Sequence, residues 1–196
     1  MTDPDFDAFA DGLDYPMFVV TTADPATGER AGCLVGFATQ CSMGPARLLV
    51  CLSRNNHTFR VASGADVLAV HALPADARDL AELFGETTGD EVDKFTRCAW
   101  TPGPDGVPLL DRCPRRLVGR VHDRVDFGDH VGFVLAPVAV GAPRPVVGGP
   151  PAVGGPPVVG GPPAVGGPPA VGGPRPAREP LLTFAAVRDL QAAHPA

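Results

Sequence analysis

Four arginines lie within one acid-free stretch of the chain, residues 30–65, and guanidinium groups are suited to holding an anion. They are Arg30, Arg47, Arg54 and Arg60, and the stretch contains no Asp, Glu or Lys. The whole chain of 196 residues has a formal net charge of −6, so the remainder sums to −6 − 4 = −10. A locally basic stretch in an acidic protein indicates a small bound anion. Two ordinary core strands with solvated arginines are the alternative.

A polar loop at residues 55–58 follows an apolar strand and precedes a short helical turn that we expect at residues 59–63. Amide groups at a helix start, together with Asn and Thr side chains and a nearby arginine, can cradle a phosphate. Arg54 has no carboxylate beside it in the sequence. We therefore expect its guanidinium to be available to the anion.

Motifs for other chemistries are missing from the sequence. It contains no HExxH, no GxSxG, no P-loop and no GxGxxG behind a strand, and its histidines and cysteines lack zinc spacing. We therefore predict no metal site. His71, inside an apolar strand, is predicted to be a hydrogen-bonded structural residue, and Trp100 a core residue. His130 directly follows a hairpin turn, where it could stabilise the turn.

Composition narrows the class of protein. Overall acidity argues against nucleic acid as a partner, because binding a phosphate backbone needs a broad basic face. There is no run of about 18 apolar residues and no basic, apolar start, so neither a membrane span nor a secretory signal is expected. Five cysteines, odd in number and without a CxxC, fit a reducing compartment. We expect a cytoplasmic protein.

The elements that must position these residues are mostly strands. Apolar or alternating runs predict six strands, at residues 17–22, 30–37, 48–53, 67–73, 117–127 and 130–136. Spacing of three and four predicts a helix over 74–84, which ends at Gly85, and residues 90–95 suggest a second short helix. Short turns between the strands favour a mainly β fold, a closed or nearly closed antiparallel barrel of six strands with one or two inserted helices.

Five hexads of the type Val-Val-Gly-Gly-Pro-Pro occupy residues 146–175. Pro removes amide donors and Gly costs backbone entropy, so no packed core is expected there. We predict three parts: a barrel domain at 1–142, a disordered or extended linker at 143–178, and a segment at 179–196 that docks back on the barrel.

Six short motifs in one order resemble the flavin reductase-like family with the FMN-binding split barrel. They lie at residues 19–22, 36–45, 52–58, 79–84, 93–95 and 128–130, and the similarity covers residues 15–140. The resemblance implies a six-stranded split barrel, a homodimer, and FMN bound near the dimer interface. The loop 36–42 would follow the ring and ribityl chain, and the loop 53–58 would hold the phosphate.

The resemblance also assigns residues to roles. His130 would be the catalytic residue near the flavin or the nicotinamide. The positions implied for FMN binding are Gly36, Phe37, Ala38, Thr39, Gln40, Cys41, Ser53, Arg54, Asn55, Asn56, His57, Thr58, Lys94 and Phe95.

The function that we expect is reduction of FMN by NADH or NADPH through hydride transfer, with the reduced flavin available to a partner flavin-dependent monooxygenase. Three alternatives stay open. The first is an FMN-binding electron carrier without turnover. The second is a deazaflavin or haem binder on the same fold. The third is a Pro-rich interaction module carried by a structural barrel.

Overall fold

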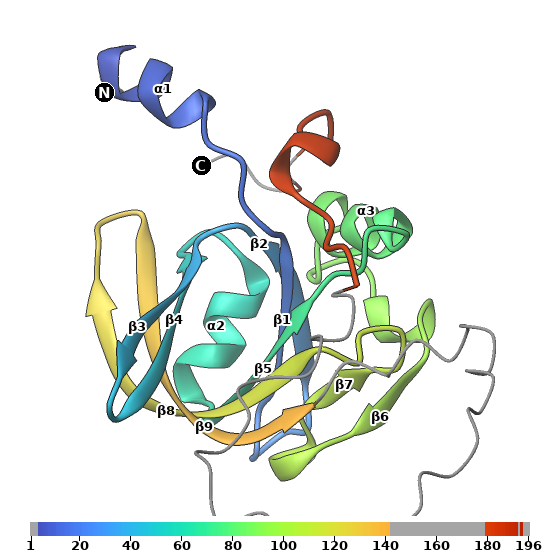
Figure 1. Ribbon diagram of the computed structural model, residues 1–196. Coiled ribbons are helices and arrows are strands. Elements are labelled where there is room, and N and C mark those ends of the chain that lie inside the picture. Colours follow the sequence, from blue (N-terminus) through green and yellow to red (C-terminus); the bar gives the residue numbers. More distant parts are fainter. Residues whose placement is uncertain (1–3, 142–178, 192, 194–196) are drawn as a thin grey trace, which may run out of the picture. The chain divides into compact units, whose positions relative to one another are not determined.

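One antiparallel sheet organises the chain. The structure is a computed structural model, and it describes residues 4–141, 179–191 and 193. In the described part the sheet has seven strands in the order β2-β1-β5-β8-β9-β4-β3. The strands are β1 (Phe18–Ala23), β2 (Arg30–Val35), β3 (Ala38–Met43), β4 (Ala46–Ser53), β5 (Val67–Ala72), β8 (Arg116–Asp126) and β9 (His130–Gly141). Figure 1 shows the strands wrapping around the helix α2 (His57–Gly64).

The prediction of a mainly β, antiparallel fold is confirmed, but the predicted count of six strands is wrong. All six expected strands are present, and β3 is the seventh; it forms from residues that we expected in a flavin loop. The short turn at Gly44-Pro45 returns the chain, so the polar residues of β3 pair with β4 as an edge strand. The ends of the sheet order, β2 and β3, do not pair with each other in the described residues.

Two more strands lie between β5 and β8 in the sequence. β6 (Trp100–Pro102) and β7 (Pro108–Leu110) form a separate antiparallel pair. Thr21, on β1, donates its hydroxyl to the carbonyl of Pro108 at 2.6 Å, and both groups are buried. This small sheet therefore packs against β1 of the main sheet.

The helices are short. α1 (Pro4–Asp11) has no buried residue, and α3 (Arg78–Glu86) buries one apolar face against the sheet, as its spacing predicted. The second helix expected over residues 90–95 is wrong, because only the 3-10 turn η1 (Lys94–Thr96) forms there. Two further 3-10 turns are η2 (Pro104–Gly106) and η3 (Phe184–Ala186).

The apolar core lies on both faces of the sheet. Inside the curve, Leu52, Leu68 and Phe133 pack together. On the other face, Leu80 and Phe84 of α3 pack with a second group of residues: Met17, Val19, Leu73, Phe95, Leu110, Leu182 and Val187. No described helix is long and apolar enough to cross a membrane.

The chain end returns to the sheet after the hexads, which lie outside the described residues. Leu182 is buried, its amide donates to the carbonyl of Leu73, and its carbonyl accepts from Met17, both at 2.9 Å. Residues 181 and 183 form isolated bridges with Pro74 and Pro16. Segments more than a hundred residues apart in the sequence therefore lie side by side (Figure 1).

Candidate functional site

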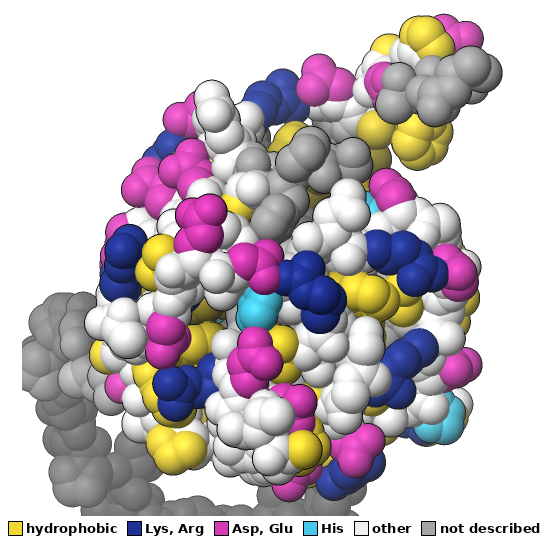
Figure 2. Space-filling view, turned by 180° about the vertical axis from the view of Figure 1, so that it is seen from behind, with side chains coloured by type: hydrophobic (Ala, Val, Ile, Leu, Met, Phe, Trp, Pro, Cys, Tyr) yellow, Lys and Arg dark blue, Asp and Glu magenta, His cyan; other side chains and the backbone are white. Residues whose placement is uncertain are grey.

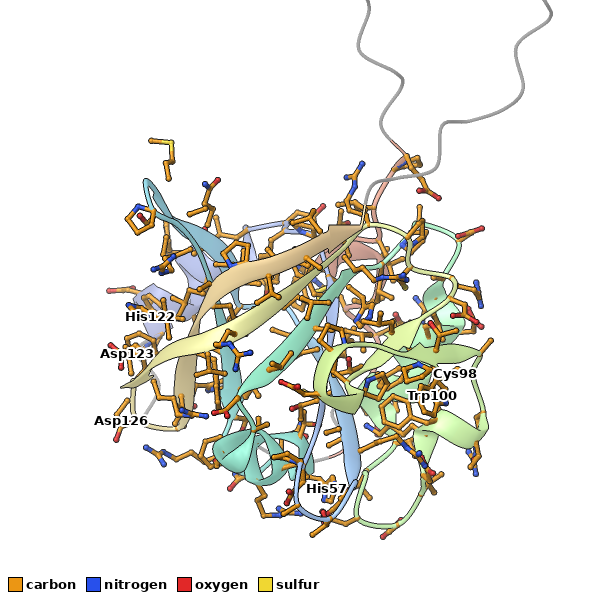
Figure 3. All side chains as sticks on the ribbon, turned by 90° about the horizontal axis from the view of Figure 1, so that it is seen from below. His57, Cys98, Trp100, His122, Asp123 and Asp126 are labelled. Carbon is orange, nitrogen blue, oxygen red and sulfur yellow. The ribbon has the colours of Figure 1, made fainter. Side chains whose placement is uncertain are left out.

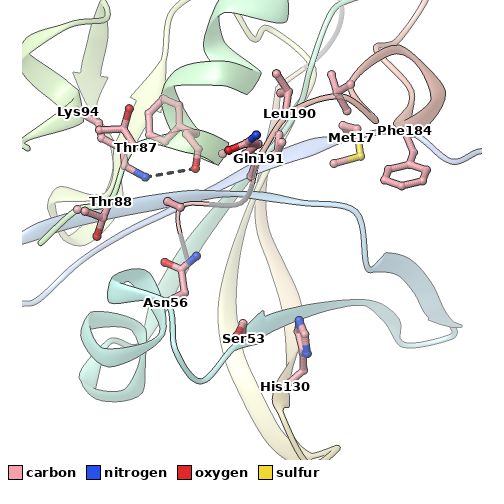
Figure 4. A pocket seen from close by; sticks show the side chains of 16 residues that line it. Met17, Ser53, Asn56, Thr87, Thr88, Lys94, His130, Phe184, Leu190 and Gln191 are labelled. Atoms are coloured by element: carbon pink, nitrogen blue, oxygen red, sulfur yellow. Dashed lines mark hydrogen bonds between the residues drawn. The ribbon is translucent and has the colours of Figure 1, made fainter. Parts of the chain in front are cut away.

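Two adjoining cavities, of about 300 and about 200 Å³, lie on the side of the sheet where β4 ends and β9 begins. Their linings share residues from five segments of the chain, so they form one two-part site. Figure 4 shows the larger cavity. The shared residues are Met17, Leu34, Ser53, Asn56, His130 and Phe184. Of the residues predicted to form the site, Ser53, Asn56 and His130 are among these shared residues.

Strand pairing brings Ser53 and His130 together. They are direct partners in the β4–β9 register, although 77 positions separate them in the sequence. The turn before His130 has Gly128 at φ +101°, a backbone conformation that favours glycine. His130 Nδ1 lies 3.0 Å from Asp129 Oδ1, and that hydrogen bond lowers the pKa of the Asp129 carboxyl. The imidazole also contacts the edge of the Phe37 ring, at 5.4 Å between centroids.

Asn56 is both a helix cap and a wall of the site. Its side-chain oxygen accepts from the amide of Thr58 at 2.9 Å and so begins α2. The side-chain nitrogen is left to donate to a ligand. Ser53 is similar, since its hydroxyl oxygen accepts from the Asn55 amide at 3.4 Å and its O–H group can still donate.

Arg54 has a carboxylate partner, although the sequence around it shows none. Its guanidinium pairs with Asp126 at 2.7 Å, and its Nε donates to the carbonyl of Gly128 at 2.7 Å. The ion pair lowers the pKa of the Asp126 carboxyl. The expectation that Arg54 lacks a carboxylate partner is wrong, because β8 brings Asp126 from 72 positions away. Arg54 therefore links the loop after β4 to the β8–β9 hairpin, a role that we call the clasp, and it lines neither cavity.

Lys94 lines the larger cavity from the opposite side. Its side chain is buried, and the ammonium donates to the carbonyls of Gly32 and Phe84 at 3.1 and 3.2 Å (Figure 4). Burial lowers the pKa of Lys94. Two of its three N–H groups are used, which leaves one for a ligand. Its neighbour Phe95 is a core residue that lines neither of the two cavities.

Other residues predicted for the site do not line these cavities. The side chains of Thr39, Gln40 and Cys41 lie exposed on the edge strand β3, with Ala38 half-buried. Asn55 is exposed outside the cavities. Thr58 is buried, and a hydrogen bond links it to the Cys33 thiol, whose pKa burial raises to about 11.

His57 points elsewhere. Its two ring nitrogens lie 3.1 Å from Glu29 and 3.0 Å from Asp90. It therefore belongs to a charged cluster outside the two cavities. Gly36 and Phe37 do line the smaller cavity, together with Tyr15.

Three of the four arginines in the predicted basic stretch pair with carboxylates from other parts of the chain. Arg30 pairs with Asp93 at 3.2 Å, and Arg60 pairs with Asp90. The Arg60 contact, with help from His57, lowers the pKa of Asp90 to about 2. Figure 2 shows cationic and anionic side chains interspersed over the face that it draws. A stretch of sequence without acidic residues therefore does not form a surface without them, because the fold brings Asp90 and Asp93 beside it.

No group of three or more His, Cys, Asp or Glu side chains in the described residues is placed to hold a metal ion. Figure 3 shows His57, Cys98 and His122 on separate parts of the molecule.

Sequence reasoning missed two walls of the larger cavity. One is the loop after α3, residues 87–89, and the other is the chain end, with Phe184, Val187, Leu190 and Gln191. The apolar spacing from Leu182 to Leu190 was the available signal. It does not show which surface the segment covers.

The chain is a mainly β protein whose antiparallel sheet carries a cavity lined in part by aromatic rings. A family model described as "Flavin reductase like domain" matches residues 10–153, which is more than half of the chain. The chain belongs to the flavin reductase-like family, as the six motifs predicted.

Curated relatives carry related names. A flavin reductase (NADH) of Kitasatospora aureofaciens is 31% identical over 134 residues, which cover 67% of this chain and 68% of the relative. A probable flavin reductase of Rhizobium meliloti is 29% identical over 64% of this chain and 38% of its own length. An FMN reductase (NADH) RutF of Stutzerimonas stutzeri is 30% identical over 57% of this chain and 63% of its own length. The chain thus spans less than two thirds of the length of these last two relatives.

Solved structures share the fold. A putative flavin reductase of Haemophilus somnus aligns with a TM-score of 0.66 at 20% identity, over 74% of this chain and 90% of its own. An FMN-binding protein of Thermus thermophilus aligns with a TM-score of 0.62 at 26% identity, over 67% and 72%.

Proposed function

We propose that this chain is a flavin reductase that binds FMN and NADH or NADPH at the two-part cavity and passes a hydride from the nicotinamide to the flavin. One observation carries the proposal. The part of the chain that matches the family, residues 10–153, supplies Ser53, Asn56 and His130, and these residues meet at the cavity. The names of the relatives, which include NADH and FMN, support the choice of ligands.

The residues of the cavity fit a ring-bearing ligand. Leu34, Phe84 and Phe184 provide apolar walls, and Ser53 and Asn56 provide hydrogen-bond donors. Ligand sites combine apolar walls with a few placed polar groups in this way. A bound flavin would supply the hydride-accepting chemistry, and the protein would bind and orient the two rings.

Different residues of the cavity contact different parts of the ligand. Ser53, Asn56 and the third N–H of Lys94 donate hydrogen bonds to the polar edge or phosphate of a ligand. The His130 imidazole lies beside the ring of the ligand, and its contacts with Phe37 and Asp129 fix the orientation of the imidazole. Backbone groups of Gly36 and Phe37, which line the smaller cavity, contact the flavin.

A second copy of the chain and a partner oxygenase complete the proposal. Large apolar side chains are exposed at Phe37, Met43 and Phe127, near the edge strand β3 and the β8–β9 turn, and a homodimer would cover them. One relative, 28% identical, is named as the reductase subunit of a stachydrine N-demethylase. This name supports transfer of reduced flavin to a partner.

A non-catalytic FMN binder is the second candidate, because the Thermus thermophilus neighbour is named as an FMN-binding protein. Turnover separates the two. Oxidation of NADH and NADPH is measured with free FMN, FAD and riboflavin as acceptors. We expect flavin-dependent oxidation of at least one nucleotide, and its absence with all three flavins would overturn the reductase proposal.

A matched pair of variants locates the site. Asn56→Asp keeps an oxygen to cap α2 but removes the amide donor, so we expect flavin affinity to fall about tenfold, the effect of one lost charge-assisted contact. Thr101→Asp adds the same charge on exposed β6 and should leave affinity unchanged. Equal affinity in both variants would remove Asn56 from the site.

A further inference from the structure

The chain end builds part of the larger cavity although it lies beyond the family match, which stops at residue 153. Five of its residues line that cavity, and we refer to them as the C-terminal wall: Phe184, Val187, Leu190, Gln191 and Ala193. In Figure 4, Phe184, Leu190 and Gln191 lie on the side of the cavity opposite Ser53, Asn56 and His130. A ligand in this cavity therefore lies between family residues and residues from outside the family match.

The wall is attached in two different ways. Before it, Leu182 is buried in the core, and backbone hydrogen bonds join it to Met17, just before β1, and to Leu73, just after β5. Beyond Leu182, Val187 is also buried, and the amides of Phe184 and Ala193 donate to the carbonyls of Tyr15 and Gly85 at 2.9 and 3.0 Å. Exposed contacts add to these: Asp189 pairs with Arg78 at 2.7 Å, and Arg188 donates to the Asp11 carbonyl at 2.7 Å. Exposed ion pairs contribute little to stability, so these exposed contacts can yield while Leu182 and Val187 stay in place.

The side chains of the wall present an apolar face. Phe184 lines both cavities and stacks on Tyr15 at 5.0 Å between centroids and 12° between planes. Val187 and Leu190 continue the face along the larger cavity. Flat apolar faces of this kind suit a planar ring system, which gains from stacking and from burial of its faces.

We propose that the C-terminal wall is a specificity-determining contact surface for the ring-bearing ligand, and that it retains the ligand by covering it. The inference rests on the proposed function, since the ligand is the flavin or nicotinamide ring. It goes beyond that function by assigning retention and ring selectivity to the five residues of the C-terminal wall.

Truncation after Thr183 tests the proposal, because it removes the wall and keeps Leu182 in the core. FMN affinity and dissociation rate are measured by quenching of flavin fluorescence, which needs no turnover. We expect the truncated chain to bind FMN about tenfold more weakly and to release it faster, because apolar contact area is lost.

Point variants keep the test valid if the truncated chain fails to fold. Leu190→Ala trims a side chain of the wall and should weaken FMN binding several-fold. Asp189→Asn loosens the fastening to Arg78 and should speed FMN release. Asp79→Asn is its matched control, since Asp79 forms a comparable exposed pair with Arg112, and neither residue lines the cavity.

The outcomes are distinguishable. If the complete chain binds neither FMN nor NADH, the proposed function fails, and this inference fails with it. If the complete chain binds FMN and the truncated chain and Leu190→Ala bind it with the same affinity and release rate, only the inference fails. Tighter binding after truncation would also overturn it, because the segment would then occupy the ligand's place.

Discussion

His71 is the titratable side chain whose burial has the clearest consequence. It is fully buried on β5; its Nδ1 faces the Val19 carbonyl at 3.0 Å, and its Nε2 accepts from the Leu110 amide at 3.1 Å. These partners require a neutral ring with the proton on Nδ1. Burial lowers the pKa of His71 from 6.5 to about 4. The prediction of a hydrogen-bonded structural histidine is confirmed.

Stability should therefore depend on pH through His71. The unfolded chain takes up this proton below pH 6.5 and the folded chain does so only near pH 4, so stability is complete above pH 6.5 and falls as the pH drops. The loss amounts to about 3 kcal/mol at most. Urea unfolding from pH 7 to 4.5 measures it. His71→Gln should be less stable at pH 7 but lose less on acidification, and an unchanged pH slope would contradict the assignment. Asp90 also has a lowered pKa, but its effect on stability falls mainly below pH 3.8, outside the pH range of this measurement.

The variant Asp126→Asn distinguishes two roles of Arg54. Binding of the flavin phosphate by Arg54 and a structural link between Arg54 and the hairpin predict different changes in the affinity for FMN relative to riboflavin. If Arg54 held the flavin phosphate, removing its carboxylate partner would free it and tighten FMN binding relative to riboflavin. The structure favours the clasp, so we expect Asp126→Asn and Arg54→Met both to weaken FMN and riboflavin by similar factors. Fluorescence titrations with the two flavins measure this. A stronger preference for FMN in Asp126→Asn would contradict the clasp.

At the scale of elements, the strand β2 and the segment before β1 meet at Gly36. A Cβ built on Gly36 would lie 2.4 Å from the ring of Tyr15, which lines the smaller cavity. A glycine is therefore required there by space, not by its backbone angle. The close approach positions Tyr15 for its stack on Phe184.

We expect Gly36→Ala to displace the Tyr15 ring, lower the melting temperature by several degrees and weaken flavin binding. Gly64→Ala is the control, because a Cβ there meets nothing within 4 Å. Calorimetry and flavin titration of both variants test the contact. Equal behaviour of the two would show that the packing of Tyr15 does not shape the cavity.

The sequence predicted strands well where one face is apolar, and poorly where neither face is. The alternating apolar residues Leu48, Val50 and Leu52 predicted β4. In the structure Val50 and Leu52 are buried in one core cluster, and Leu48 packs against it. The polar residues of β3 carry no such pattern, and their strand forms only because β4 supplies hydrogen-bond partners. Six motifs identified the family, and Ser53, Asn56 and His130 do meet. Arg54, Thr58 and His57 depart from prediction because their partners come from distant parts of the chain.

At the scale of the whole molecule, the hexads separate the family part from the segment that contributes the C-terminal wall. They lie outside the described residues, and their composition predicts no packed core. Removing four of the five hexads should therefore leave the melting temperature and flavin affinity unchanged. A large loss of either would assign the repeat a structural or binding role and favour the interaction-module alternative.

An anaerobic absorption spectrum shows whether this cavity brings nicotinamide and flavin together. The protein is loaded with FMN, freed of excess flavin, and titrated with NADH and then NADPH. We predict that the oxidised-flavin bands bleach with at least one nucleotide, and more slowly in Asn56→Asp than in Thr101→Asp. If no flavin stays bound, the same titration is made with free FMN present. Bands that persist with both nucleotides but bleach with dithionite would contradict the reductase proposal and identify a flavin carrier.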